Sequence, residues 1–259
     1  MNLFQVIQNK RLKFFVVSAS LTGLLVFLSF PSYQELAWLL LLPVATVLLT
    51  HFALGRSSGI EVFTLHLLPM ALALGAVFNQ YSFPNFSSLV KILIWFSFFF
   101  IFYTLLLALN VFRVERLKGE KIPLEKAARP VVFLLSFLVA FLLLTVIYKF
   151  ELGVLLTAIF VFLLGFVLSL NFFWFFTLTD LFERSHFLGA AAVGVGIVQI
   201  SLAFSFFPWK THLRGLSEAV FFYAILGVVR AYFEKHLKYA IVLEYILLSL
   251  GVFLFVRFF

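Results

Sequence analysis

The stretch VVFLLSFLVAFLLLTVIY, residues 131–148, holds 18 residues without a single charge and decides the fold class. A helix over these residues is about 27 Å long, close to the roughly 30 Å hydrocarbon core of a bilayer. Its only polar side chains are those of Ser136, Thr145 and Tyr148. A run of this length is too long for an ordinary core helix, so it predicts a helix that crosses a membrane.

The composition of the whole chain agrees with this reading. Of the 259 residues, 64% are hydrophobic and 12% are charged. Soluble domains have about 45–50% apolar and about 25% charged residues. A water-soluble protein this apolar would have too little polar surface to cover its core. We therefore expect an all-α, multi-pass bundle of transmembrane helices, in which residues 1–259 form a single membrane-embedded domain.

Uncharged apolar runs recur along the chain. Seven are long enough to span alone: 14–30, 36–54, 62–78, 92–112, 131–148, 152–179 and 187–207. Two shorter cores give spans at 216–233 and 239–256 once flanking residues are added. This predicts nine spans, the alternative being seven spans and a re-entrant or interfacial C-terminal hairpin. The 28 residues of 152–179 are too many for an upright helix, so that segment must tilt, bend or leave the membrane near 171–179.

The only long hydrophilic stretch, NVFRVERLKGEKIPLEKAARP at residues 110–130, precedes the opening run. It is expected to anchor the chain at the cytoplasmic face through six basic residues: Arg113, Arg116, Lys118, Lys121, Lys126 and Arg129. With a cytoplasmic N-terminus, fourteen of the 19 Lys and Arg residues lie on the inside, as the positive-inside rule requires. We therefore expect a cell membrane, most simply a bacterial inner membrane, with anionic lipid headgroups as partners. Because the basic residues sit in short loops, nucleic acid is not expected as a partner.

The second half of this stretch carries helix signals. Pro123 suits a first helical turn, and Glu125 and Arg129 have the i, i+4 spacing of an ion pair. These residues predict a short surface helix from Pro123 to Ala128 that ends before Pro130. A docking surface for a soluble protein is the alternative reading, although charge runs of this kind are usually just solvated.

The motif ALNVFRVE…IPLEKAAR in this region resembles a loop of uncharacterised bacterial polytopic membrane proteins that have no assigned activity. The resemblance covers about a tenth of the chain. It implies a membrane topology and nothing about chemistry.

The sequence also contains a candidate internal duplication. A shift of 120 residues places HLLPMALALGAVF, from His66, on HFLGAAAVGVGIV, from His186. Spans one to four, about 14–118, would then correspond to spans five to eight, about 131–238, with 239–259 appended. Transporters often contain weak repeats of this kind.

Two charges fall inside the last two spans. Arg230 lies seven residues before Leu237, where the two helices meet, and Glu244 lies seven residues after it. An antiparallel pair of helices would place both charges at the same depth. We interpret them as an intramembrane ion pair that holds the hairpin together, and a proton or ion site is the alternative.

A second polar cluster is expected at the cytoplasmic ends of spans two, three and seven. Its members are His51, Glu61, His66, Asp180, Glu183 and His186. Two facing histidines could ligate haem or a metal. Lone histidines near membrane surfaces are more often interfacial, and no ligand motif of demanding spacing is present. No cofactor and no metal site is therefore predicted.

Span seven is rich in small residues. Helix packing is expected at Gly189, Ala190, Ala192, Gly194 and Gly196, with Gln199 forming an interhelical hydrogen bond. A substrate pathway lined by this helix is the alternative.

The sequence contains no nucleophile elbow, zinc-protease motif or P-loop, and it has no cysteine. We therefore expect a non-enzymatic membrane protein, either a scaffold or assembly component or a small-solute transporter. A protein partner or a homo-oligomer would fit the scaffold role. A membrane-embedded enzyme or cofactor carrier that uses the His/acid cluster is the alternative.

Overall fold

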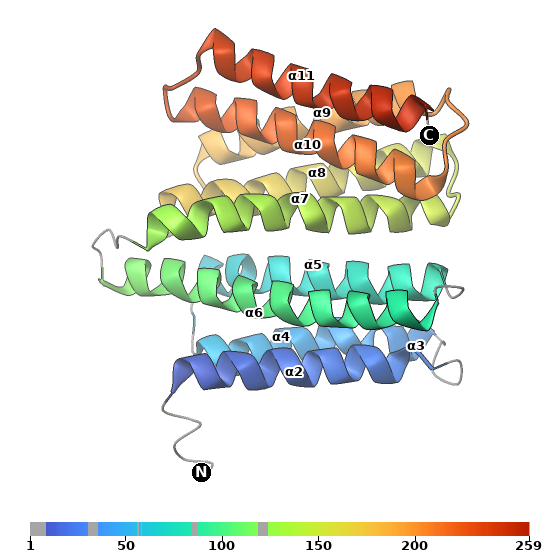
Figure 1. Cartoon of the computed structure of the whole chain (residues 1–259). Coiled ribbons are helices and arrows are strands. Elements are labelled where there is room, and N and C mark those ends of the chain that lie inside the picture. Colours follow the sequence, from blue (N-terminus) through green and yellow to red (C-terminus); the bar gives the residue numbers. More distant parts are fainter. Residues whose placement is uncertain are drawn as a thin grey trace. The chain divides into compact units, whose positions relative to one another are not determined.

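Figure 1 shows the computed structural model of the chain, which describes residues 9–30, 36–55, 57, 59–83, 87–118 and 124–258. Within these residues the regular structure is entirely α-helical, which confirms the expected fold class. The helices are α2 (Lys10–Leu28), α3 (Leu36–Leu39), α4 (Leu41–Leu54), α5 (Ile60–Ser82), α6 (Ser88–Lys118), α7 (Glu125–Lys149), α8 (Val154–Thr177), α9 (Arg184–Phe204), α10 (Thr211–Phe233) and α11 (Tyr239–Phe258).

Each of the nine predicted segments is helical over most of its length. In the described part of the chain, eight helices are long and apolar enough to cross a membrane, and α10 and α11 are both among them. The segment predicted at 36–54 is broken into α3 and α4 instead. Neither helix alone is long enough to cross a bilayer. The two together, about 28 Å long, approach the thickness of its hydrocarbon core. The count of nine spans therefore stays a prediction.

The break between α3 and α4 has a cause in the sequence. Pro43 lies in the first turn of α4. A proline ring clashes with the carbonyl four residues earlier, here that of Leu39, and it has no N–H to bond there. The observed end of α3 at Leu39 and the restart at Leu41 fall where this clash would occur.

The long run 152–179 does not fill its whole length with helix. α8 ends at Thr177, and Leu178 takes a left-handed conformation with a φ of 51°. The N–H of Leu178 donates to the carbonyl of Trp174, and the indole N–H of Trp174 donates to the carbonyl of Thr179 at 2.9 Å. The tilt, bend or exit from the membrane expected near 171–179 stays a prediction.

The hydrophilic stretch is more helical than predicted. α6 continues to Lys118, and α7 begins at Glu125 and passes through Pro130 to Lys149. The predicted short helix ending before Pro130 is therefore wrong, and its start at Pro123 lies outside the described residues. Pro130 is only the sixth residue of α7 and is exposed, so its ring removes one hydrogen bond close to the helix start, where the cost is small.

The chain divides into two compact units, residues 1–135 and 136–259. In the first unit α2 packs on α4 and α6, and α4 packs on α5. In the second unit α9 packs on α8 and α10, and α11 packs mainly on α10. The contacts α4 with α5, α5 with α6 and α4 with α6 have counterparts in α8 with α9, α9 with α10 and α8 with α10. The proposed duplication would produce this correspondence, which is partial because it leaves out α2 and its expected counterpart α7. The duplication stays a prediction.

Large apolar side chains are exposed along the middle of helices and not only at their ends. Phe96 of α6, Leu163 of α8 and Leu247 of α11 are 61%, 47% and 60% exposed. Contiguous apolar surface of this kind is not stable in water, and it is what lipid tails require. The protein is therefore a multi-pass membrane protein.

Candidate functional site

The most concentrated polar site lies in residues 136–259, at one end of three helices. Tyr148 stands in the last turn of α7, Ser201 in the last turn of α9, and Arg214 and Glu218 in the first two turns of α10. Gly215 allows α7 and α10 to approach closely here. A Cβ at this position would lie 2.5 Å from Thr145 Oγ1 and 3.1 Å from the Thr145 backbone nitrogen.

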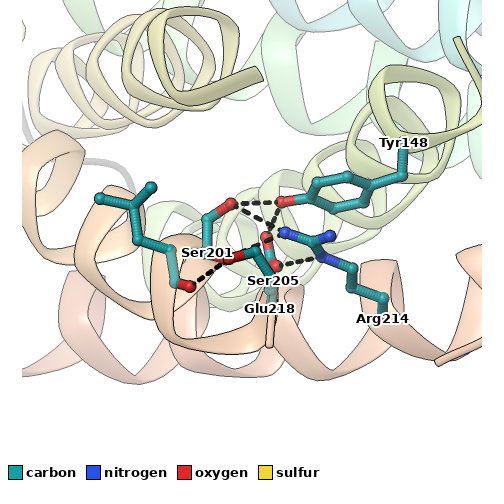
Figure 2. Close-up of polar contacts among 6 residues, drawn as sticks. Tyr148, Ser201, Ser205, Arg214 and Glu218 are labelled. Atoms are coloured by element: carbon teal, nitrogen blue, oxygen red, sulfur yellow. Dashed lines mark hydrogen bonds and ion pairs between the residues drawn. The ribbon is translucent and has the colours of Figure 1, made fainter. Parts of the chain in front are cut away.

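Glu218 is fully buried, and both of its carboxylate oxygens are bound (Figure 2). Arg214 Nε donates to Glu218 Oε1 at 3.0 Å. The Tyr148 hydroxyl donates to Glu218 Oε2. The same hydroxyl lies 2.8 Å from Ser201 Oγ, where either group can donate. The carboxylate is thus held by a cation and a phenol from two different helices.

Arg214 joins the third helix to this cluster. Its Nη2 donates to the carbonyl of Ser201 at 2.9 Å, near the C-terminal end of α9. Its guanidinium carbon lies 4.0 Å from the centre of the Tyr148 ring, a cation–π distance, and Figure 2 shows the two groups side by side. Hydrogen bonds connect Tyr148, Ser201, Arg214 and Glu218 into one cluster. Removing Arg214 or Glu218 would leave the other charge buried and uncompensated.

A pocket of about 360 Å³ opens beside this cluster. Its lining comes from the ends of α7, α8, α9 and α10 and from the loops between them: Tyr148, Glu151, Gly153, Val154, Thr157, Ser201, Leu202, Ser205, Trp209, Thr211 and Arg214. Most of these residues carry a polar side chain, unlike the apolar groove of about 320 Å³ between α10 and α11. Pockets of this size and mixed character bind small molecules.

The sequence predictions did not include this cluster. Glu218 lies inside the predicted span 216–233, and no role was predicted for it. The spacing of Arg214 and Glu218, i and i+4 at a predicted helix start, is the signal that could have found the ion pair. Nothing in the sequence pairs them with Tyr148, which is 70 residues away from Glu218.

Arg230 has a contact that the sequence analysis did not predict. The structure places Arg230 Nε 3.1 Å from Glu234 Oε1 on the same helix, with the guanidinium 4.4 Å from the Phe176 ring centre. Glu244 is exposed on α11. The ion pair between Arg230 and Glu244 stays a prediction.

The predicted His/acid cluster is divided between the two units. In residues 1–135, the His51 and His66 rings face each other with centres 5.6 Å apart and an interplanar angle of 32°. Glu61 lies 3.8 Å from Arg113, and both side chains are nearly buried. Arg113, predicted as an anchor to the membrane surface, is therefore a partner of α5.

The other three members lie in residues 136–259, around the start of α9. Glu183 is the N-cap, and it forms a reciprocal capping box with His186. The Glu183 backbone N–H donates to His186 Nδ1 at 3.2 Å. Asp180 is exposed in the preceding turn. This geometry is a helix start, in which side chains bind the free N–H groups of the first turn. Among the described residues, no three His, Asp or Glu side chains are placed to hold a metal ion.

Several small residues of α9 lie at close helix contacts. A Cβ on Gly194 would lie 3.0 Å from the Phe162 ring of α8, and a Cβ on Gly196 would lie 3.1 Å from Ile225 of α10. A Cβ on Gly189 would lie 2.5 Å from the Phe233 ring. Ala190 is fully buried, whereas Ala192 is exposed.

Gln199 does not occupy a helix contact in the described structure. It is exposed on α9, where the sequence predicted an interhelical hydrogen bond. That role stays a prediction.

The remaining basic residues of the hydrophilic stretch flank the gap between α6 and α7. Arg129 forms an ion pair with Glu125, at the i, i+4 spacing seen in the sequence. Lys126 is exposed and Arg116 is half-buried. Lys121 and the side chain of Lys118 lie outside the described residues.

Helices, apolar surface and polar pocket together define the class of the protein: a multi-pass α-helical membrane protein. The chain belongs to the family described as a protein of unknown function (DUF5656), whose sequence model matches residues 44–259. No curated protein and no solved structure matches the chain. This result agrees with the resemblance noted for the hydrophilic stretch, which implied a family without an assigned activity.

Proposed function

We propose that this protein is a non-enzymatic, transporter-like membrane protein that binds a small solute in the polar pocket of residues 136–259. The observation that carries the proposal is the buried cluster of Tyr148, Ser201, Arg214 and Glu218 beside a pocket of about 360 Å³. Charged groups within membrane-spanning helices are costly, and they usually mark solute or ion pathways. A scaffold or assembly role would need helix packing alone and would gain nothing from an open polar cavity.

The distribution of basic residues gives the proposal a direction. With nine spans and a cytoplasmic N-terminus, fourteen of the 19 Lys and Arg residues face the cytoplasm. Under this topology the loops 150–153 and 205–210 face the opposite side. The pocket would then open away from the cytoplasm and would receive a solute from outside the cell.

Blocking the pocket tests the proposal. Purified protein is heated with inorganic phosphate, succinate, glycine, putrescine or glucose, one solute at a time. A solute present at 100 times its dissociation constant adds about 2.7 kcal/mol of stability. That corresponds to a rise in the melting temperature of roughly 5–10 °C for a chain of this size. Thr157→Trp places a large side chain in the pocket and should abolish the rise.

The control variant for this experiment is Ile159→Trp. Ile159 is on the same helix and is 45% exposed, so the added ring points away from the core. A rise that persists in Ile159→Trp and disappears in Thr157→Trp supports solute binding in the pocket. If no solute of any class changes the melting temperature of the unmodified protein, a scaffold role replaces the proposal.

A specific observation in residues 1–135 favours a second function, that of a cofactor or metal carrier. His66 is buried, and its Nδ1 lies 2.6 Å from the carbonyl of Val62. Its Nε2 has no partner among the described residues. Metal-binding histidines commonly donate one ring N–H to a backbone carbonyl in this way. The facing His51 and His66 also line a pocket of about 360 Å³.

Spectroscopy and metal analysis of the purified protein test this second function. A carrier should show a haem absorption band or stoichiometric metal that is lost in His51→Ala and in His66→Ala. His186→Ala, in the capping box of α9, serves as the control and should retain the cofactor. The carrier function is contradicted if the unmodified protein contains no absorbing group and no metal, and if all three variants fold normally.

A further inference from the structure

We infer that the group recognised in the pocket is an oxyanion, such as a phosphate or a carboxylate. This inference rests on the proposed solute-binding function and adds the chemical class of the ligand. The first support is Arg214, which lines the pocket. Its Nε and Nη2 are used for Glu218 and Ser201, whereas its Nη1 makes no hydrogen bond with the described residues. Arginine is the side chain best suited to hold phosphate or carboxylate oxygens.

A second donor in the pocket lacks an acceptor. Trp209 lines the cavity, and its ring is fixed by Phe204 and Phe253, with ring centres 4.7 Å and 5.4 Å away. The indole Nε1 is buried and has no hydrogen-bond partner in the described part of the chain. An indole nitrogen can only donate, and a buried donor without an acceptor is costly. The nitrogen itself is closed off from solvent, so an oxyanion in the pocket would reach it and supply that acceptor only after the surrounding side chains shift.

The backbone adds further donors. α8 begins at Val154 and α10 begins at Thr211, and both residues line the pocket. Neither helix has a side-chain cap at its N-terminus. The N–H groups of a first helical turn have no carbonyl partner within the helix and attract anions. The C-terminal end of α9 also reaches the pocket, but there Arg214 already covers the Ser201 carbonyl.

Two carboxylates lie close to these donors, and neither takes their place. Both oxygens of Glu218 are already bound, by Arg214 and by Tyr148, and its side chain does not line the pocket. Glu151 does line the pocket, but it is exposed, so water solvates its charge. The inner part of the pocket is therefore rich in donors, with an acidic residue only at its exposed edge.

The test uses delipidated protein in detergent and inorganic phosphate as the probe. Trp209→Phe removes the indole N–H and keeps an aromatic ring, so it should weaken phosphate binding about tenfold. The matched control is Trp95→Phe in α6, because Trp95 Nε1 is also buried without a partner but lies in the other unit. That variant should bind phosphate as the unmodified protein does.

Glu151→Gln gives a test of opposite sign. It removes a negative charge from the pocket edge, so it should tighten phosphate binding by a few-fold. A decrease in phosphate affinity would instead show that the carboxylate itself holds part of the ligand, and it would overturn the oxyanion inference.

The source of the oxyanion is resolved by native mass spectrometry of protein reloaded with phosphatidylglycerol. A lipid adduct that Trp209→Phe loses and Trp95→Phe keeps identifies a headgroup, whereas binding of free phosphate or succinate without such an adduct identifies a soluble anion. Both outcomes support the inference. Stabilisation by glucose or putrescine and by neither anion would overturn it while leaving the proposed solute binding intact. No binding by any solute or lipid would overturn both.

Discussion

Replacing Arg214 with alanine should lower the free energy of unfolding by about 3–5 kcal/mol, because Glu218 would remain buried without a counter-charge. The Glu218 side chain is fully buried, and among the described residues Arg214 supplies its cationic contact, at 3.0 Å. The double variant Arg214→Ala with Glu218→Gln removes the stranded charge as well. It should therefore lose less stability than the single variant, measured by thermal or denaturant unfolding in detergent.

The same helix offers a matched control for this prediction. Glu234 also forms an i, i+4 ion pair, with Arg230, but the two side chains are 34% and 29% exposed. Exposed pairs contribute about 0–1 kcal/mol, so Glu234→Ala should have a small effect. Equal losses for Arg214→Ala and Glu234→Ala, or a double variant less stable than Arg214→Ala, would contradict the buried ion pair.

The second large effect is expected at Gly215. A valine here should lower the free energy of unfolding by about 3 kcal/mol, at the upper end of overpacking costs. Its Cβ would lie 3.1 Å from the backbone nitrogen of Thr145, and a backbone atom cannot rotate out of the way. α7 would have to move away from α10, which would also draw Tyr148 away from Glu218.

Gly251→Val in α11 is the control for this substitution. No atom lies within 4 Å of a Cβ built on Gly251. Glycine and valine differ by only about 0.5 kcal/mol in helix propensity, so stability should hardly change. Thermal unfolding of the two variants side by side separates close packing from propensity. Similar melting temperatures for both would show that α7 and α10 do not pack closely at Gly215.

The helices were largely predictable because their cause is local. Each apolar run is read from consecutive residues, without knowledge of contacts elsewhere in the chain. The errors arose where two local signals competed. Pro43 interrupts an apolar run that looked continuous, while Pro130 does not end a helix that has only just begun. The effect of a proline depends on which carbonyl it deprives of a partner, and that depends on where the helix starts.

The candidate site was much less predictable because it depends on contacts between distant segments. Arg214 and Glu218 are neighbours on one helix, so their pairing could have been read from their spacing. Tyr148 and Ser201 join them only through the packing of α7 and α9, which a single sequence does not reveal. Arg230 contacts Glu234, four residues further along the chain, a local pairing that the sequence analysis did not name. Its predicted pairing with Glu244 stays a prediction.

The position of both charges of the Arg214–Glu218 pair on one helix also matters while the protein is being made. A single charged residue near the centre of a membrane helix raises the cost of insertion by about 2.5–3.5 kcal/mol. Since Arg214 has its counter-ion Glu218 four residues away, this end of α10 can enter the bilayer without an unpaired charge. α7 and α9 are synthesised earlier, so Tyr148 and Ser201 are already in the membrane when it arrives. Insertion of α10 therefore does not have to wait for any later segment of the chain.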